Sequence, residues 1–240
     1  MIELYKKQHK SSFSLGVFPT IELLKYKPTA VLKVYLSTKG SKNRGIDKIV
    51  DLCKRHKIPY EFSDNTVNKL SPKENTHAVG IFNKYDSPVK AGENHVVLVN
   101  PQDMGNIGTL IRTMLAFDIL NLAIISPGVD VFHPKAVRSA MGAVFQINFS
   151  YFPSLLDYKQ SFANKLYFFT KAGSTLAEKA NYVSPFALVF GNEAAGFSHD
   201  QTNLGETVKL RQSAKVDSLN ISITAGIAMY EATKTILAKS

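Results

Sequence analysis

From residue 93 to the C-terminus, short apolar runs alternate with helical patterns, and this alternation restricts the possible folds more than any other feature of the chain. The runs HVVLVN, NLAIIS, LYFFTK and FALVFG each have the length and the near-continuous apolar character of a buried strand. Strands that are buried on both faces are typical of a mostly parallel sheet with helices on both sides. We therefore predict an α/β fold with a parallel sheet for residues 93–240.

The first ninety residues form a separate, smaller pattern. The run AVLKVYLS alternates like a strand, and apolar side chains recur at helical spacing between residues 46 and 53. The polar, turn-rich stretch SPVKAGEN follows at residues 87–94. We place a domain boundary there, which gives a small α/β domain over residues 1–92 and a second domain over residues 93–240.

Basic residues are concentrated in the first domain. The chain has a net charge of +10, and residues 1–92 hold 17 Lys and Arg against 8 Asp and Glu, whereas residues 93–240 hold 12 against 11. A polyanion, most commonly nucleic acid, is the natural partner of such a segment. A solvated lysine-rich face would have the same charge, so charge alone does not decide between the two.

Composition also indicates the compartment. Cys53 is the single cysteine, which excludes an internal disulfide and fits a reducing environment. No apolar stretch reaches the ~20 residues that span a bilayer, the N-terminus has no signal-peptide pattern, and the histidines show no metal-ligand spacing. We expect a cytoplasmic protein with neither a membrane span nor a metal.

The stretch NPQDMGNIGTLIRT follows the first strand of the second domain. Ligands of an open α/β sheet bind beyond the carboxyl ends of its strands, where this junction lies. Gly105 and Gly108 would let a ligand approach the backbone, although a glycine turn that only packs helix on strand explains them better when they are taken alone. Arg112 interrupts the apolar helix pattern, so we expect a phosphate, an ion pair with Glu193 or an exposed position to account for it.

Two further junctions have the same character. ALVFGNEAAGFS ends a strand at Gly191 and continues with Glu193 and Gly196, and LRQSAKVDSLNISITAGIAMYE places Ser218 and Asn220 at the start of a long helix. Side chains at such positions often only cap a helix, and capping alone would account for Ser218. Three polar loops that each follow a strand can nonetheless converge on one site.

In this order, the three stretches resemble the three motifs of the SpoU/TrmH family of RNA ribose 2′-O-methyltransferases. The first motif is matched by Asn-Ile-Gly-x-x-x-Arg at residues 106–112, the second by Gly-x-Glu-x-x-Gly at residues 191–196, and the third by Asp-Ser-Leu-Asn-Ile-Ser at residues 217–222. The resemblance covers roughly residues 93–240. It implies a SPOUT domain whose C-terminal chain forms a trefoil knot, S-adenosylmethionine as cofactor, an RNA substrate and a homodimer.

The resemblance also assigns roles by motif position. Backbone around Gly191, Leu210 and Leu219 should hold the cofactor. The catalytic surround should consist of Asn106, Arg112, Glu193, Ser218 and Asn220. For Arg112, a general base and a clamp on the target phosphate both stay open, and the clamp has the better physical support because a guanidinium is always charged. Residues 1–92 are similar in placement to the family's ribosomal-protein-like substrate-binding domain, which favours ribosomal RNA over tRNA as the substrate.

The third stretch departs from the family pattern. Where the family usually has Ile-Pro-Met and then a glycine, this chain has Leu210, Arg211 and Gln212, with Ala214 at the glycine position. Without proline and glycine, the loop that should border the cofactor is less constrained. A catalytically silent RNA-binding protein that retains the fold is therefore a second hypothesis. The glycine turns and the strand-helix alternation alone suggest a third, a dinucleotide-dependent oxidoreductase, which requires a G-x-G-x-x-G pattern that the sequence lacks.

Overall fold

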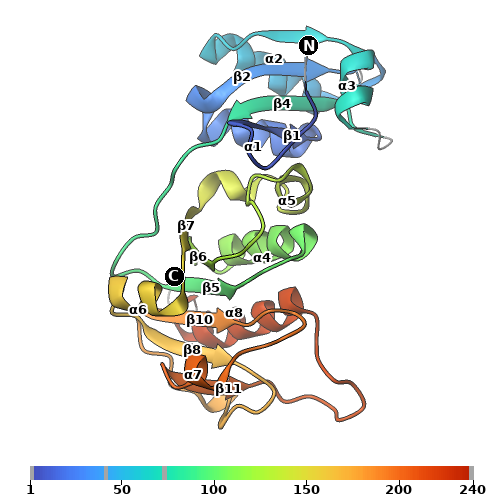
Figure 1. Cartoon of the computed structure of the whole chain (residues 1–240). Helices are drawn as coiled ribbons and strands as arrows, with labels where there is room; N and C mark the ends of the chain where they lie inside the picture. The colour runs from blue at the N-terminus through green and yellow to red at the C-terminus, as the bar shows by residue number, and fades with distance from the viewer. Residues whose placement is uncertain (1–2, 41–42, 72–74, 238–240) are drawn as a thin grey trace. The chain divides into compact units, whose positions relative to one another are not determined.

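The computed structural model describes residues 3–40, 43–71 and 75–237, and their contacts group the chain into two compact units (Figure 1). The first unit combines Met1–Tyr85 with Asp130–Gln146, and the second combines Asp86–Val129 with Ile147–Ser240. The chain therefore passes from one unit to the other three times.

A four-stranded sheet in the order β1-β4-β2-β3 forms the centre of the first unit. β4 is antiparallel to both of its neighbours, whereas β2 and β3 run parallel. The helices α1 and α2 pack on each other, and α2 buries the apolar residues that the sequence predicted at helical spacing. The bounds are β1 Ser11–Leu15, α1 Val17–Tyr26, η1 Pro28–Ala30, β2 Val31–Leu36, η2 Thr38–Gly40, α2 Arg44–His56, β3 Tyr60–Phe62, α3 Asp64–Leu70, β4 Ala78–Asn83, α5 Pro134–Ser139 and η3 Ala143–Gln146.

Residues 130–146 pack with the first unit, although the sequence-based division assigned them to residues 93–240. The rings of Phe132 and Phe145 meet the ring of Phe82 on β4 edge-on, with centroids 5.5 and 5.3 Å apart. The Asp130 carboxylate accepts hydrogen bonds from Tyr5 Oη at 2.7 Å and from Lys84 Nζ at 2.6 Å. Both contacts join residues far apart in sequence, which no local pattern reports. By contacts, the first boundary also lies between Tyr85 and Asp86 rather than after residue 92.

The second unit contains a seven-stranded sheet in the order β7-β6-β5-β10-β8-β11-β9, and every neighbouring pair runs parallel. All five residues of β5, of β6 and of β10 are buried, as expected for strands covered on both faces. The predicted parallel α/β sheet is thus confirmed. The bounds are β5 His95–Val99, α4 Met104–Ala116, β6 Asn121–Ile125, β7 Asn148–Phe152, α6 Leu155–Ser161, β8 Lys165–Phe169, β9 Thr175–Leu176, η4 Ala177–Lys179, β10 Phe186–Phe190, α7 His199–Thr202, β11 Glu206–Lys209 and α8 Ile221–Leu237.

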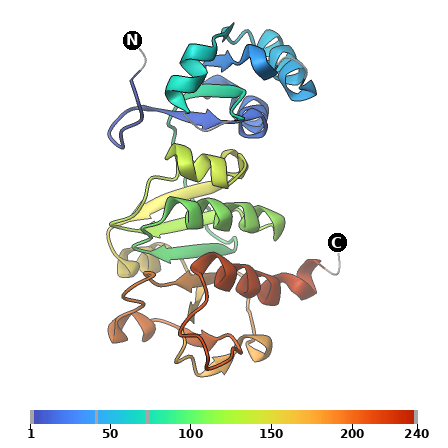
Figure 2. The same ribbon diagram turned by 90° about the vertical axis from the view of Figure 1, so that its right-hand side faces the viewer.

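Helices cover this sheet and leave its carboxyl edge to loops. α6 packs against β6 and β7, while α4 and α8 pack side by side, with α8 also against β10 (Figure 2). Because β5, β10, β8 and β11 are consecutive and parallel, the loops that follow them emerge at the same edge. Among the helices described here, none is long and apolar enough to cross a membrane.

Candidate active site

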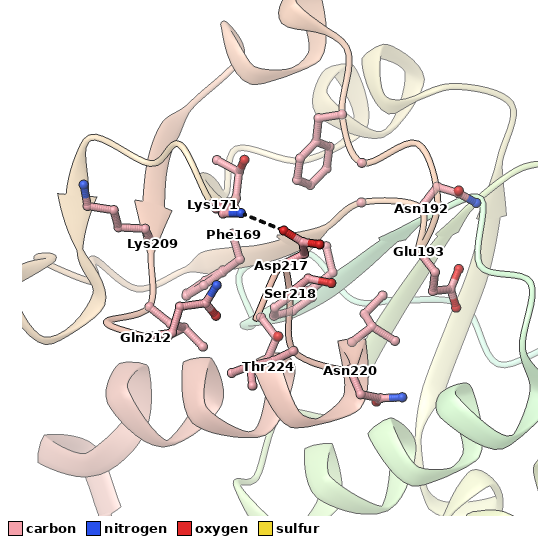
Figure 3. Close-up of a pocket in the computed structure, with 18 of the residues that line it drawn as sticks. Phe169, Lys171, Asn192, Glu193, Lys209, Gln212, Asp217, Ser218, Asn220 and Thr224 are labelled. Carbon is pink, nitrogen blue, oxygen red and sulfur yellow. Dashed lines mark ion pairs between the residues drawn. The ribbon is translucent and has the colours of Figure 1, made fainter. Parts of the chain in front are cut away.

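A cavity of about 930 Å³ lies at the carboxyl edge of the sheet in the second unit. Residues that follow β8, β10 and β11 form most of its wall, and α4 and the start of α8 complete it. In Figure 3, Lys209 and Gln212 lie at one end of the cavity, and Glu193 and Asn220 lie at the other. Seven of the eight residues singled out from the sequence line it: Asn106, Gly191, Glu193, Leu210, Ser218, Leu219 and Asn220.

The first motif lies inside a helix rather than in a loop. The Asp103 carboxylate accepts a hydrogen bond from Asn106 N at 2.7 Å and caps α4, which begins at Met104. Gly105 and Gly108 are therefore helical residues, and the expected glycine turn was wrong. This start places the Asn106 side chain at the end of the helix that borders the cavity.

Arg112 is the predicted site residue that does not line the cavity. It lies in the third turn of α4, and its side chain is exposed. The buried stripe of α4 runs through Ile107, Leu110, Ile111 and Met114, and Arg112 follows about 100° beyond Ile111. Within the described residues, no hydrogen bond or ion pair reaches its guanidinium, so a pair with Glu193 does not account for it, and its exposed position leaves it open to a phosphate.

The loop after β10 is folded tightly around Asn192. Its Oδ1 accepts from Ala194 N at 2.9 Å and from Ala195 N at 3.0 Å, and its Nδ2 donates to Asn100 O at 2.8 Å in the loop after β5. Gly191 lies against the backbone of Gly196, where an added Cβ would come within 2.8 Å of the carbonyl carbon. Asn192 thus fixes the loop that carries the exposed Glu193.

The loop after β11 leads into α8, which begins at Ile221 rather than at the predicted Ser218. Asn220 caps the helix, since its Oδ1 accepts from Ser222 N at 2.8 Å and from Ser222 Oγ at 2.6 Å. Its Nδ2 donates to Asn106 Oδ1 at 3.0 Å, which joins the first and third motifs. The capping role expected for Ser218 was wrong, and in the described part of the chain its exposed hydroxyl has no hydrogen-bond partner.

Lys171, Lys209 and Asp217 are charged residues of the cavity for which the sequence predicted no role. Lys171 follows β8, and its Nζ lies 3.6 Å from Asp217 Oδ1 across the cavity, as Figure 3 shows. The rule that ligands bind beyond the carboxyl ends of parallel strands could have identified Lys171, because the run LYFFTK has the pattern of a strand. Over residues 3–40, 43–71 and 75–237, no group of three or more His, Cys, Asp or Glu could hold a metal ion.

All the residues that line the cavity lie within the part of the chain that matches one protein family. The model of the SpoU rRNA Methylase family matches residues 93–230. Over 244 residues the chain is 27% identical to the 23S rRNA (guanosine-2′-O-)-methyltransferase RlmB of Acinetobacter baylyi, a match that covers 93% of this chain and 97% of the relative.

Solved structures share the fold. The crystal structure of the SpoU methyltransferase AviRb from Streptomyces viridochromogenes, in complex with the cofactor AdoMet, superposes with a TM-score of 0.81 at 21% identity and covers 95% of this chain and 92% of that one. A structure that concerns 2-OH methylation of C/U34 on tRNA superposes with a TM-score of 0.56 at 23% identity. It covers 61% of this chain and 98% of its own.

Proposed function

The chain belongs to the SpoU rRNA Methylase family, and on this basis we propose that it transfers a methyl group from S-adenosylmethionine to a ribose 2′-hydroxyl of ribosomal RNA. The observation that carries the proposal is the convergence of residues from three distant motifs on one cavity at the carboxyl edge of the parallel sheet. Ligands of open α/β sheets bind at this edge.

The cavity has the size and the wall for S-adenosylmethionine. Its volume of about 930 Å³ falls within the ~300–1,000 Å³ of small-molecule sites. Phe169, Phe190 and Leu219 offer apolar surface to an adenosine, while backbone at Gly191 and Leu210 offers hydrogen-bonding groups. Gly191 has no room for a side chain, which lets the backbone of Gly196 lie close to it in this wall of the cavity. The bound cofactor would supply a methyl group that is already activated on a sulfonium.

The chain's own side chains would hold the ribose and the adjoining phosphate. Asn220 is fixed by Asn106 and by the helix that it caps, so its amide is preorganised beside the cavity. The Ser218 hydroxyl and the Glu193 carboxylate line the cavity and have no described hydrogen-bond partner, which leaves both available to the substrate. For Arg112 we propose a phosphate clamp, because an exposed and permanently charged guanidinium suits a phosphate better than proton abstraction.

Charge supports an RNA substrate that the first unit helps to bind. Residues 1–85 and 130–146 carry 18 Lys and Arg against 8 Asp and Glu, whereas residues 86–129 and 147–240 carry 11 of each. The whole net charge of +10 thus resides in the first unit. The relative named for 23S rRNA matches this chain along 93% of its length, and the tRNA-related structure covers only 61% of it. We therefore favour ribosomal RNA as the substrate. The cytoplasmic location of the protein stays a prediction.

We also propose a homodimer formed through the second unit and a trefoil knot around the cavity. The exposed residues Ile223, Ile227 and Tyr230 recur at i, i+4 and i+7 on α8 and form an apolar row that a second copy would bury. The knot is supported by α8, which returns to pack on α4 and β10 after the loops of the cavity. Light scattering should give twice the chain mass of 26.5 kDa, and a chain-sized mass at micromolar concentration would refute the dimer.

The proposed activity is tested with RNA from cells that lack the gene. Purified protein and radiolabelled S-adenosylmethionine should label one ribosomal RNA in such a preparation and should leave RNA from the parent strain unlabelled. Mapping of 2′-O-methyl positions in the two strains should show one nucleotide that differs. A protein that binds RNA and S-adenosylmethionine but transfers no methyl group would instead be a silent member of the family.

A further inference from the structure

The loop Leu210–Asn220 forms a large part of the cavity wall but is weakly held. Nine of its residues line the cavity. In the described structure, residues 211–219 share no backbone–backbone hydrogen bond with another element, and most of them are exposed. Ordering a free backbone costs about 1–2 kcal/mol per residue. Side chains must therefore decide how far this wall keeps its shape.

Asn220 is bonded to Asn106 at the end of the loop, and at its beginning Arg211 is joined to a second structured anchor. Arg211 donates to Glu178 Oε1 from Nε at 3.1 Å and from Nη2 at 2.9 Å. Glu178 lies in η4, where the neighbouring Ala177 is buried and its carbonyl accepts a hydrogen bond from Tyr182 Oη at 3.1 Å. A backbone hydrogen bond and the Arg211 guanidinium lower the pKa of Glu178, so the carboxylate is charged at neutral pH.

The position of this pair in the sheet makes the contact easy to form. β11 and β9 run parallel with Val208 opposite Thr175 and Lys209 opposite Leu176. The same offset of 33 residues places Arg211 opposite Glu178, two residues beyond the last backbone pair. Both residues lie just beyond the paired strands, Arg211 after β11 and Glu178 in η4 after β9. The ladder thus brings their backbones near each other before either side chain is ordered, which lowers the entropic cost of the ion pair.

A second ion pair of the loop is weaker. Lys171 and Asp217 approach to 3.6 Å, and their side chains are 65% and 106% exposed, against 71% and 37% for Arg211 and Glu178. A single longer contact to a fully exposed carboxylate holds a loop less firmly than two hydrogen bonds to one partly buried carboxylate oxygen.

We propose that Arg211 is a positioning residue for the cofactor, because its ion pair with Glu178 holds the loop Leu210–Asn220 in the shape that forms the cavity wall. Affinity for S-adenosylmethionine then depends on a pair of surface charges and falls more steeply with salt than in a chain without the pair. This inference rests on the proposed function, since it concerns the same cavity.

Calorimetric titration of the full-length protein with S-adenosylmethionine tests the pair. Arg211→Gln and Glu178→Gln should each raise Kd roughly two- to five-fold, the effect of an exposed ion pair. The exchanged double variant Arg211→Glu with Glu178→Arg should recover most of the affinity. Lys215→Gln is the matched control. Lys215 lies in the same loop and forms no ion pair among the described residues, so this variant should bind S-adenosylmethionine like the wild type.

Amide hydrogen exchange of residues 211–219 without cofactor gives a second readout. Exchange should be faster in both single variants and should return toward the wild-type rate in the exchanged variant. The proposal is overturned if the single variants bind and exchange like Lys215→Gln, or if exchanging the charges restores neither property. If the wild type itself does not bind S-adenosylmethionine, the proposed function fails, and hydrogen exchange still decides whether Arg211 holds the loop.

Discussion

Replacing Asn220 by aspartate should separate a structural role of this residue from a functional one. The Asn220 oxygen caps α8 by accepting from Ser222 N and Ser222 Oγ, and the Asn220 nitrogen donates to Asn106 Oδ1. Aspartate keeps an accepting oxygen for the cap but loses the donor. It also turns a negatively charged oxygen toward Asn106 Oδ1, so the present hydrogen bond is lost and the Asn106 amide must rotate before it can donate in its place.

The expected stabilities follow from these contacts. Asn220→Ala loses the cap and the bond to Asn106, together roughly 1.5 kcal/mol at this exposed position. For a chain of this size, that loss lowers the melting temperature by ~3–6 °C. Asn220→Asp should melt close to the wild type, because aspartate caps as well as asparagine and its charge interacts favourably with the helix N-terminus.

The expected activities are different. Both Asn220 variants should lose at least ~100-fold in methyl-transfer rate, the usual effect of removing one preorganised donor. Asn106→Ala is the matched control, since it breaks the same hydrogen bond without touching the cap, and its loss should not add to that of Asn220→Asp. Initial rates with radiolabelled cofactor and thermal melts measure both quantities. An Asn220→Asp protein with near wild-type rate would show that the link to Asn106 does not serve the reaction.

Three further predictions concern single residues. Arg112→Lys and Arg112→Ala should each lower the methyl-transfer rate at least ~100-fold. The melting temperature should change little, because the side chain is exposed. An Arg112→Ala protein that melts early but stays active would show that Arg112 is a structural residue. Burial lowers the pKa of His95 below its ordinary 6.5, and its ring is hydrogen-bonded to Tyr158 Oη. Just below that value, the unfolded chain binds a proton that the folded chain does not bind, so the free energy of unfolding should fall by up to ~1.4 kcal/mol for each unit by which the pH is lowered. In urea titrations at several pH values, the free energy of unfolding of His95→Gln should change less steeply with pH. Burial raises the pKa of Cys53 to about 11, so Ellman's reagent should label it only after denaturation, and prompt labelling of the native protein would contradict this.

The second unit could be predicted well because its signals are local. Apolar runs of five buried residues indicate parallel strands, and a parallel sheet brings the loops after those strands to one edge. That rule alone predicts that Asn106, Glu193 and Asn220 lie near one another. The family resemblance adds the cofactor and the reaction, which periodicity cannot report.

The remaining features depend on partners that are distant in sequence. β1 was missed because Ser12 and Ser14 occupy its buried face, where hydrogen bonds to other elements replace apolar contacts. The start of α4 is the exception, because the Asp103 cap that decides it is local and was overlooked. From the sequence, Arg211 was interpreted as the loss of a proline that would constrain the loop. In the structure the same residue constrains the loop differently, through its ion pair with Glu178, which lies 33 residues away in the sequence.

The three crossings between the units also determine how RNA binding by the first unit must be tested. A cut after residue 92 would remove Phe82 and leave Phe132 and Phe145 without their packing partner, so weaker RNA binding by the remainder could reflect misfolding. Charge reversal in the intact chain avoids this ambiguity.

Lys48 lies exposed on α2 in the first unit and Lys179 lies exposed in the second, and neither has an ion pair among the described residues. Lys48→Glu should weaken RNA binding and lower the slope of log K against log salt by roughly one phosphate contact, whereas Lys179→Glu should change both less. Equal effects of the two substitutions, measured by filter binding at several salt concentrations, would mean that the +10 charge of the first unit does not direct RNA to that unit.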